Sequence, residues 1–204
     1  LLAITLILPS TTSIVIKKTT NIKNINTGNN KNILTNQEKY AVIVAGGPLF
    51  DQLQDEFWRS AQHAYYTLRD LGYKDDHIYH LSKGFFYPGV DRISFFISVR
   101  DAIAGWLASH SSYSSDVLIC LVDHGDSYGN FYPGRFLPIS GQILNSWLRN
   151  VRYHICTIVI DACYSGNFMR YLSDENRIVI TCTDSESYGY AWNGDEVCFF
   201  KVFL

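Results

Sequence analysis

The sequence has little of what marks several broad classes of protein. Its formal net charge is only -2 over 204 residues, so no charge excess points to nucleic acid or to an anionic membrane surface. It has no dinucleotide fingerprint, no phosphate loop and no metal-ligand spacing, so we expect no nucleotide, metal or other cofactor. No apolar run is long enough to cross a membrane, and no internal repeat is present.

Cysteine is scarce and poorly spaced for pairing. The five cysteines show no Cys-x-x-Cys spacing, and their odd number leaves at least one thiol free within a monomer. Four of them lie in apolar runs, where cysteine usually behaves as a small buried hydrophobe; these are Cys120, Cys156, Cys182 and Cys198. We therefore expect few or no disulfides, which by itself leaves the compartment open.

The first 38 residues are predicted to be a tail or linker. Leu1 to Leu8 reads LLAITLIL, which fits either the core of a truncated signal peptide or a strand of a preceding domain. The first alternative favours export, and the localisation is otherwise unknown. Residues 20–37 are rich in Asn and show no apolar period, which is typical of a linker. We place the folded domain at 39–204, with its carboxyl end open to truncation.

Apolar residues are plentiful, at 47 %, and short apolar runs alternate with helical patterns. Four of the runs are apolar at nearly every position, as in strands buried on both faces of a parallel sheet. The pattern predicts an α/β fold: a doubly wound, mostly parallel sheet with helices on both faces. The expected strands cover 41–44, 77–81, 117–122, 155–160 and 178–182. The expected helices cover 52–71 and 91–109, together with a segment capped by Ser140 and a segment that begins at Val197. In the second of these helices Asp91 is the expected cap and Ile97 is expected on the buried side.

Two short motifs follow neighbouring strands at the edge where α/β sheets bind ligands. Asp123-His124-Gly125 comes after the third strand, and Asp161-Ala162-Cys163 comes after the fourth. A histidine titrates near neutral pH, and a thiolate is a strong nucleophile. Taken alone, each is more often structural. Together, with a glycine in each turn to free a backbone N–H, they form the nucleophile, base and oxyanion set that acyl transfer needs.

These motifs resemble those of a known family, the legumain-like cysteine peptidases, which belong with caspases and gingipains. Its pattern is an apolar strand followed by His-Gly, then another followed by Asp/Glu-Ala-Cys-x-Ser-Gly. The matching runs here are CLVDHGDSYGNF and IVIDACYSGNF, and the similarity extends from Lys39 to about Lys201, with bacterial and archaeal members in particular. The resemblance implies a caspase-like fold and a cysteine endopeptidase that uses no metal.

The resemblance also implies roles for the residues of the two motifs. Cys163 would attack the scissile carbonyl, and His124 would protonate the leaving amine and later help activate water. The backbone N–H groups of Gly125 and Cys163 would hold the oxyanion. A thioester acyl-enzyme would form, as in covalent catalysis generally.

The residues of the substrate pocket follow the family less closely. Asp161 stands where asparaginyl members keep an acid, but Glu56 stands where they keep a base, with Arg59 three residues later. Pro48 also replaces an Asn that some members use to orient the histidine. Cleavage after Asn or Asp and cleavage after a basic residue both stay open. The tail of the last strand, including Asp184 and Ser185, is either another wall of the groove or a solvated loop.

Two other functions remain compatible with the sequence. A catalytically inactive caspase-like scaffold would use the same fold for binding. A peptide ligase would use the same acyl-enzyme and transfer it to an amine. For a peptidase, the partners would be protein or peptide substrates, with room for a propeptide or further domains.

Overall fold

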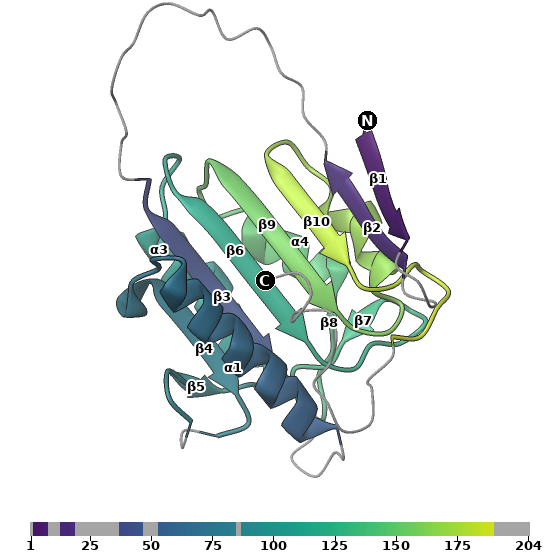
Figure 1. Cartoon of the computed structure of the whole chain (residues 1–204), viewed down its shortest axis with the longest axis horizontal. Helices are drawn as coiled ribbons and strands as arrows, with labels where there is room; N and C mark the ends of the chain where they lie inside the picture. The colour runs from purple at the N-terminus through teal and green to yellow at the C-terminus, as the bar shows by residue number, and fades with distance from the viewer. Residues whose placement is uncertain (1, 8–12, 19–36, 47–52, 85–86, 190–204) are drawn as a thin grey trace, which may run out of the picture.

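The computed structural model describes residues 2–7, 13–18, 37–46, 53–84 and 87–189 of the chain (Figure 1). Within these residues the main sheet has eight strands, in the order β1-β2-β10-β9-β6-β3-β4-β5. The six strands from β10 to β5 pair in parallel, whereas β2 runs antiparallel to both β10 and β1. The bounds are β1 Leu2–Ile7, β2 Ser13–Lys18, β3 Lys39–Ala45, β4 Ile78–Ser82, β5 Arg92–Ile93, β6 Asp116–Val122, β9 Ile155–Asp161 and β10 Arg177–Thr181.

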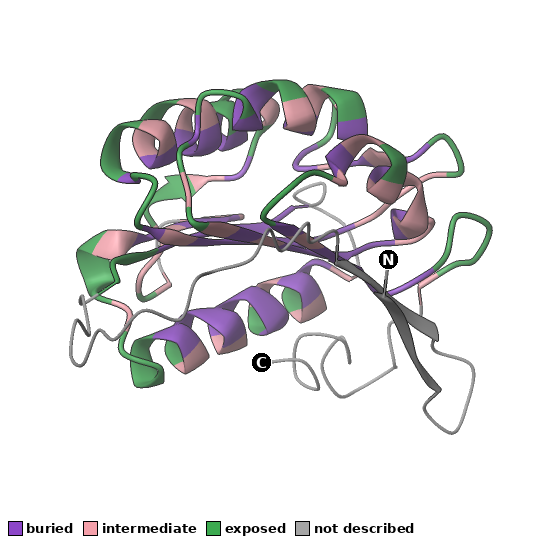
Figure 2. Cartoon of the chain, turned by 90° about the horizontal axis from the view of Figure 1, so that it is seen from above, coloured by how far each residue is buried: buried purple, intermediate pink, exposed green. Residues whose placement is uncertain are grey.

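Helices cover both faces of the sheet (Figure 2). One face carries α1 (Gln54–Asp70), and the loop that follows it contains the short 3-10 helix η1 (Asp75–His77). The other face carries α2 (Phe96–Arg100), the π-helix η2 (Asp101–Leu107), α3 (Ala108–His110), α4 (Gly141–Leu148), the 3-10 helix η3 (Ser165–Phe168) and α5 (Met169–Leu172). A small second sheet pairs β7 (Asn130–Phe131) with β8 (Ile139–Ser140).

The sheet lies between two apolar cores because successive side chains of a strand point to opposite faces. In β3, Ile43 and Ala45 pack toward α1, whereas Val42 and Val44 pack toward the helices on the other face. All four side chains are fully buried. The predicted α/β fold, doubly wound and mostly parallel with helices on both faces, is therefore confirmed, and the arrangement is consistent with a caspase-like fold.

The predicted helix over 91–109 is wrong at its start. The Asp91 carboxylate does not cap a helix; it accepts a hydrogen bond from the backbone N–H of His80 at 2.7 Å. The next residues form β5, and the helix begins only at Phe96, where the Ser98 hydroxyl accepts from the Phe95 N–H. Ile97, expected on the buried side, is 54 % exposed, because the inward face of this helical segment is formed by Ser98, Val99, Ala102 and Ile103.

The segment predicted as an N-terminal tail contains two strands of this same sheet. β2 pairs with β10 in the register Thr181 with Val15, and β1 continues the sheet beyond β2. The Asn-rich residues 20–36 and the helix expected from Val197 lie outside the described residues, as does Cys198. The domain boundary at 39 thus stays a prediction.

Among the described residues, no helix is both long enough and apolar enough to span a membrane.

His80 of β4 is the one histidine for which burial governs the charge state in the described structure. Its side chain is fully buried beneath α1, and its ring stacks on Tyr65 with centroids 5.8 Å apart. Neither ring nitrogen has a hydrogen-bond partner in the described part of the chain. Burial disfavours the charged ring and lowers the pKa of His80 from 6.5 to about 4.

We therefore expect the contribution of His80 to stability to become unfavourable as the pH falls from about 6.5 to 4. In that window the unfolded chain binds a proton that buried His80 cannot, and the full effect is about 3 kcal/mol. Above 6.5 both states are neutral and the effect is absent. Urea unfolding from pH 4 to 7 should show that the stability of His80→Phe relative to the wild type increases as the pH falls, whereas that of His110→Phe, at an exposed ring, stays constant. A constant difference between His80→Phe and the wild type would contradict the assignment.

Candidate active site

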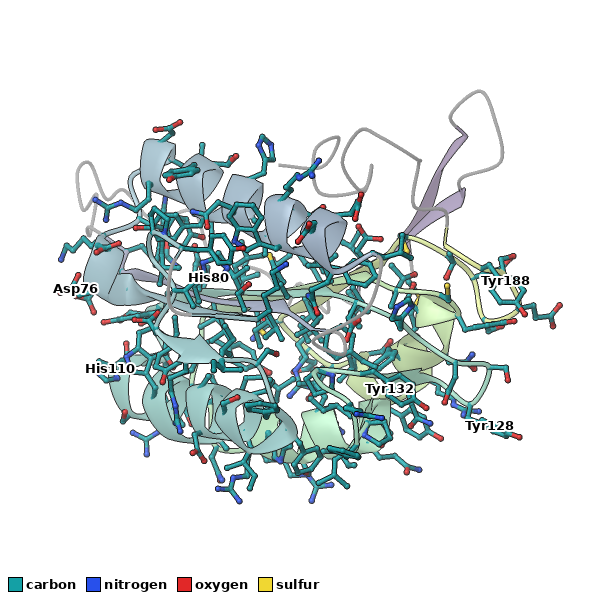
Figure 3. The ribbon with its side chains drawn as sticks, turned by 90° about the horizontal axis from the view of Figure 1, so that it is seen from below. Asp76, His80, His110, Tyr128, Tyr132 and Tyr188 are labelled. Atoms are coloured by element: carbon teal, nitrogen blue, oxygen red, sulfur yellow. The ribbon has the colours of Figure 1, made fainter. Side chains whose placement is uncertain are left out.

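The order of strands reverses beside β3, which makes the carboxyl ends of the neighbouring strands a topological switch point. From β3 the chain adds β4 and β5 on one side, then returns to place β6, β9 and β10 on the other. Ligands of open α/β sheets bind at such a switch point. The turn at Gly46 and the two sequence motifs all leave the sheet at this edge. Figure 3 shows Tyr132 and Tyr188 at this end of the molecule and Asp76 at the other.

The two motifs lie on adjacent strands and meet in space. Val122 at the end of β6 is in register with Asp161 at the end of β9. In the turns that follow these two strands, a methyl group built on Gly125 would overlap the carbonyl oxygen of Cys163 and lie 3.2 Å from the Cβ of Ala162. The absence of a side chain at Gly125 is therefore what allows the His124 turn and the Cys163 turn to pack together.

His124 is half-buried and held by its surroundings. Its ring meets the Phe57 ring of α1 edge-to-face, with centroids 5.0 Å apart and planes at 89°. Its carbonyl oxygen accepts a hydrogen bond from the Tyr132 N–H at 3.2 Å. These contacts attach the histidine turn to α1 on one side and to the β7–β8 hairpin on the other.

Cys163 differs from the three other cysteines within the described residues. Cys120, Cys156 and Cys182 are buried, whereas Cys163 is half-buried, and all four are free thiols. Burial raises the pKa of Cys156 to about 12, and it also raises that of Cys120 and of Cys182. These three are therefore held as neutral thiols, and Cys163 is the one with access to solvent. Few or no disulfides were expected, and the described cysteines form none.

The turn that carries Cys163 is strained and firmly supported. Tyr164 adopts a left-handed backbone with φ +55°, which costs about 1–2 kcal/mol for a residue with a side chain. Ser165 then donates its N–H to the Ala162 carbonyl at 3.3 Å and to the Thr183 hydroxyl at 3.0 Å. Such strain persists only where the surroundings fix it, as in the turns of active sites.

The loop after β10 lies directly against the nucleophile. The Gly189 N–H donates to the Cys163 sulfur at 3.3 Å, and the thiol faces the Gly189 carbonyl at 3.8 Å. The Tyr164 N–H donates to the Ser187 carbonyl at 2.9 Å. Sequence reasoning missed Gly189, since a glycine in a polar loop carries no signal that distinguishes this role from a plain turn.

Asp184 and Ser185 shape this loop mainly through their backbones. The Asp184 carbonyl accepts from the Gly166 N–H at 3.2 Å, and the Ser185 carbonyl accepts from the Asn167 side chain at 3.0 Å. The N–H groups of Glu186 and Ser187 hydrogen-bond the Asp184 carboxylate and lower its pKa. Both predicted residues are exposed at the site's edge, and the Asp184 carboxylate is already used within its own loop.

The two acids predicted for the substrate pocket have contrasting surroundings. Asp161 is buried, with its side chain beside the Cys182 thiol, and burial raises its pKa to about 7. Glu56 lies in the first turn of α1, one residue before Phe57, and is half-buried. Neither Asp161 Oδ2 nor Glu56 Oε2 has a hydrogen-bond partner in the described part of the chain. Arg59 is exposed, and its charge acts on Asp55.

Asp161→Asn is expected to stabilise the fold at neutral pH. The folded state holds the carboxyl protonated up to about pH 7, whereas the unfolded carboxyl ionises near 3.8. Stability is thus lost as the pH rises from 3.8 to 7, and the amide avoids a loss of about 4 kcal/mol. Urea unfolding should show the gain at pH 7 and none at pH 3.8 or below. Asp184→Asn, at an exposed carboxylate, serves as the control.

Asp126 fixes the hairpin beside His124 and was not singled out from the sequence. Its carboxylate accepts hydrogen bonds from Tyr128 N–H, from Asn130 N–H and side-chain amide, and from the Tyr132 hydroxyl. Partial burial alone would raise the pKa of Asp126, but these hydrogen bonds outweigh it and lower the pKa. An Asp three residues before a glycine, here Gly129 at φ +77°, is a turn signal that could have revealed it.

The fold and this edge define an α/β protein with a half-buried thiol and an imidazole at its switch point. No family model matches the chain, and a search of curated proteins gave no match. Among the described residues, no group of three or more His, Cys, Asp or Glu side chains is arranged to hold a metal ion. Pro48 lies outside the described residues.

Proposed function

We propose that the chain is a cysteine endopeptidase with Cys163 as nucleophile and His124 as acid and base. The main observation in support of this proposal is the packing of two turns at the ends of adjacent parallel strands. The turn with the half-buried Cys163 thiol packs against the turn with His124 at Gly125. A nucleophile, a base and backbone donors at one solvent-facing edge are what acyl transfer needs.

In the proposed reaction the Cys163 sulfur forms a bond to the substrate carbonyl carbon, and its proton passes to His124. The backbone N–H groups of Gly125 and Cys163 would stabilise the oxyanion, which is commonly the largest contribution in such reactions. His124 then protonates the amine as the C–N bond breaks, and water hydrolyses the thioester.

Asp161 gives this proposal a pH-dependent preference at the residue before the cut. Below pH 7 a protonated carboxyl both donates and accepts hydrogen bonds, which suits a side-chain amide such as that of Asn. Above pH 7 the carboxylate, with Glu56 nearby in the family's pattern, favours Lys or Arg instead. The two specificities that the sequence leaves open are thus two protonation states of one pocket.

The test is hydrolysis of fluorogenic peptides that differ only at the residue before the cut, measured from pH 4 to 8. We expect cleavage after Asn to dominate at acid pH and cleavage after Lys or Arg to gain as the pH passes 7. Asp161→Asn should remove this crossover. A strict preference for large apolar residues at every pH would exclude the acidic pocket while leaving the peptidase standing.

A binding scaffold without catalysis is the second candidate, and the Gly189 contact is the observation that favours it. The Gly189 backbone contacts the Cys163 sulfur, the atom that a substrate carbonyl would have to reach. Alkylation by iodoacetamide near neutral pH, followed by mass spectrometry, separates the two. Fast modification of Cys163, slowed in His124→Ala, supports the enzyme, with buried Cys120 and Cys156 as internal controls. Modification no faster than that of a free thiol, together with no peptide cleavage, supports the scaffold.

A further inference from the structure

A groove of about 460 Å³ opens on the sheet face that carries α2. Its two walls are the β5–α2 segment and the loop between β7 and β8. The groove is lined by Arg92, Ile93, Phe95, Phe96, Ile97, Ser98, Gly134, Arg135, Phe136 and Leu137. The site described above uses none of these residues.

Several large apolar side chains around the groove are exposed to water. Phe95, Ile97, Phe136 and Leu137 are between 49 % and 81 % exposed, although each is a large apolar residue. Single exposed apolar residues are common on protein surfaces, but a contiguous set around one hollow marks a surface that binds something. The occupant should therefore be apolar along much of its length.

The charge of the lining restricts the occupant further. Two arginines, Arg92 and Arg135, contribute guanidinium groups, and no carboxylate is among the lining residues. Arg92 is partly engaged by Asp101 at 3.4 Å, but both side chains are more than one third exposed, so that pair is weak. Arg135 lies over the Phe136 ring at 5.5 Å. An acidic apolar partner fits this lining, and a basic one does not.

The groove is also connected to the proposed active site by a short stretch of backbone. Tyr132 donates its N–H to the His124 carbonyl, and two residues later Gly134 packs against Phe95, with a built methyl 3.2 Å from that ring. The three residue-to-residue steps from Tyr132 to Arg135 span at most about 10 Å even when fully extended. A bound peptide only a few residues longer than the scissile region would reach from one to the other.

We propose that this groove is a second contact site for the substrate, and that it binds an extended apolar segment carrying carboxylates. Among the strands that the structure describes, β5 is the last on this side of the sheet, so its outer edge offers a place where an extended peptide can add as a strand. Apolar side chains enter the hollow, and the carboxylates pair with Arg92 and Arg135. The role in substrate selection rests on the proposed peptidase function, whereas the binding itself does not.

Binding is tested with a fluorescein-labelled peptide of alternating Leu and Glu, measured by fluorescence anisotropy on the full chain carrying Cys163→Ala. Arg92→Gln together with Arg135→Gln should raise the Kd about tenfold, as expected for the loss of two charge pairs. Arg100→Gln, an exposed arginine on α2 outside the lining, is the matched control and should change the Kd less than twofold. Phe136→Ser should also weaken binding, and thermal melts establish that each variant is folded.

Three binding results, and one result on self-association, would overturn the binding proposal. The binding results are an unchanged Kd in the double variant, an equal loss in Arg100→Gln, and equally tight binding of a peptide with Lys in place of Glu. Self-association of the chain that Phe136→Ser abolishes would assign the groove to a second copy and would also overturn it.

The link to catalysis has a separate readout. Adding the Leu-Glu segment to a fluorogenic substrate should lower KM in the active chain and leave kcat unchanged, and the double arginine variant should lose that gain. If the peptide binds but no substrate is cleaved, the peptidase proposal fails and the groove stands. If substrates are cleaved and the added segment leaves KM unchanged, the role in substrate selection fails.

Discussion

Cys163→Ala is expected to reduce peptide hydrolysis to background. The reaction proposed here passes through a thioester, and within the described residues no other cysteine has solvent access beside His124. Removing a nucleophile from an enzyme of this kind costs up to about 10⁶ in kcat. His124→Ala should cost about 10²–10⁴, the usual contribution of a positioned acid and base. Both rates come from hydrolysis of the best fluorogenic peptide at its optimal pH.

Cys156→Ala is the matched control for this experiment, because it removes a sulfur that is buried in the core of the same sheet. It should lower stability without lowering kcat by more than its effect on the folded fraction. Hydrolysis that survives in Cys163→Ala would show that another group does the chemistry. Loss in Cys163→Ala but not in His124→Ala would remove His124 from the mechanism and leave the nucleophile assigned.

Gly125→Ala is expected to have the next largest effect on activity, from a single added methyl group. That methyl would overlap the Cys163 carbonyl oxygen and press on Ala162 at 3.2 Å. The obstacle is backbone and not the end of a flexible side chain, so the turn that holds the nucleophile has to shift. A displacement of about 1 Å at a reacting group costs about 100-fold in rate. Overpacking of this kind also lowers stability by about 1–3 kcal/mol.

The matched control is Gly105→Ala in η2, where an added Cβ meets nothing within 4 Å. It should leave kcat/KM unchanged and stabilise the helix by about 0.5–1 kcal/mol. Full activity in Gly125→Ala would mean that the two turns are not held as tightly as their packing indicates. It would also weaken the assignment of the Gly125 N–H as an oxyanion donor, since that N–H could then move without penalty.

The sequence predicted the sheet well because its signal is local. In β6 and β9 nearly every residue is apolar, as two-sided burial requires, and the structure confirms both strands as parallel neighbours. That adjacency was enough to place His124 and Cys163 at one edge. The start of the helix after β5 was harder, because Asp91 is a good cap by type but its carboxylate is already taken by the backbone of β4.

Other features of the site depend on contacts between distant segments, and no local pattern reports them. Gly189 contacts Cys163 across 26 residues, and the Ser165 turn depends on Thr183, which is 18 residues away. The raised pKa of Asp161 follows from burial in the finished fold, not from its neighbours in sequence. Glu56 can be placed on α1 from the helical period, but its distance from Asp161 cannot be predicted that way.

The strands β1 and β2 also bear on how the protein behaves at high concentration. An uncovered strand at the edge of a sheet presents unpaired N–H and C=O groups, and these recruit strands from other molecules and promote aggregation. Here β2 takes up that position against β10 along the register from Lys18 to Val15. A shortened protein that starts at residue 39 would uncover β10, next to the loop that holds Cys163. Insolubility of such a fragment would therefore reflect a lost edge strand rather than a misfolded core.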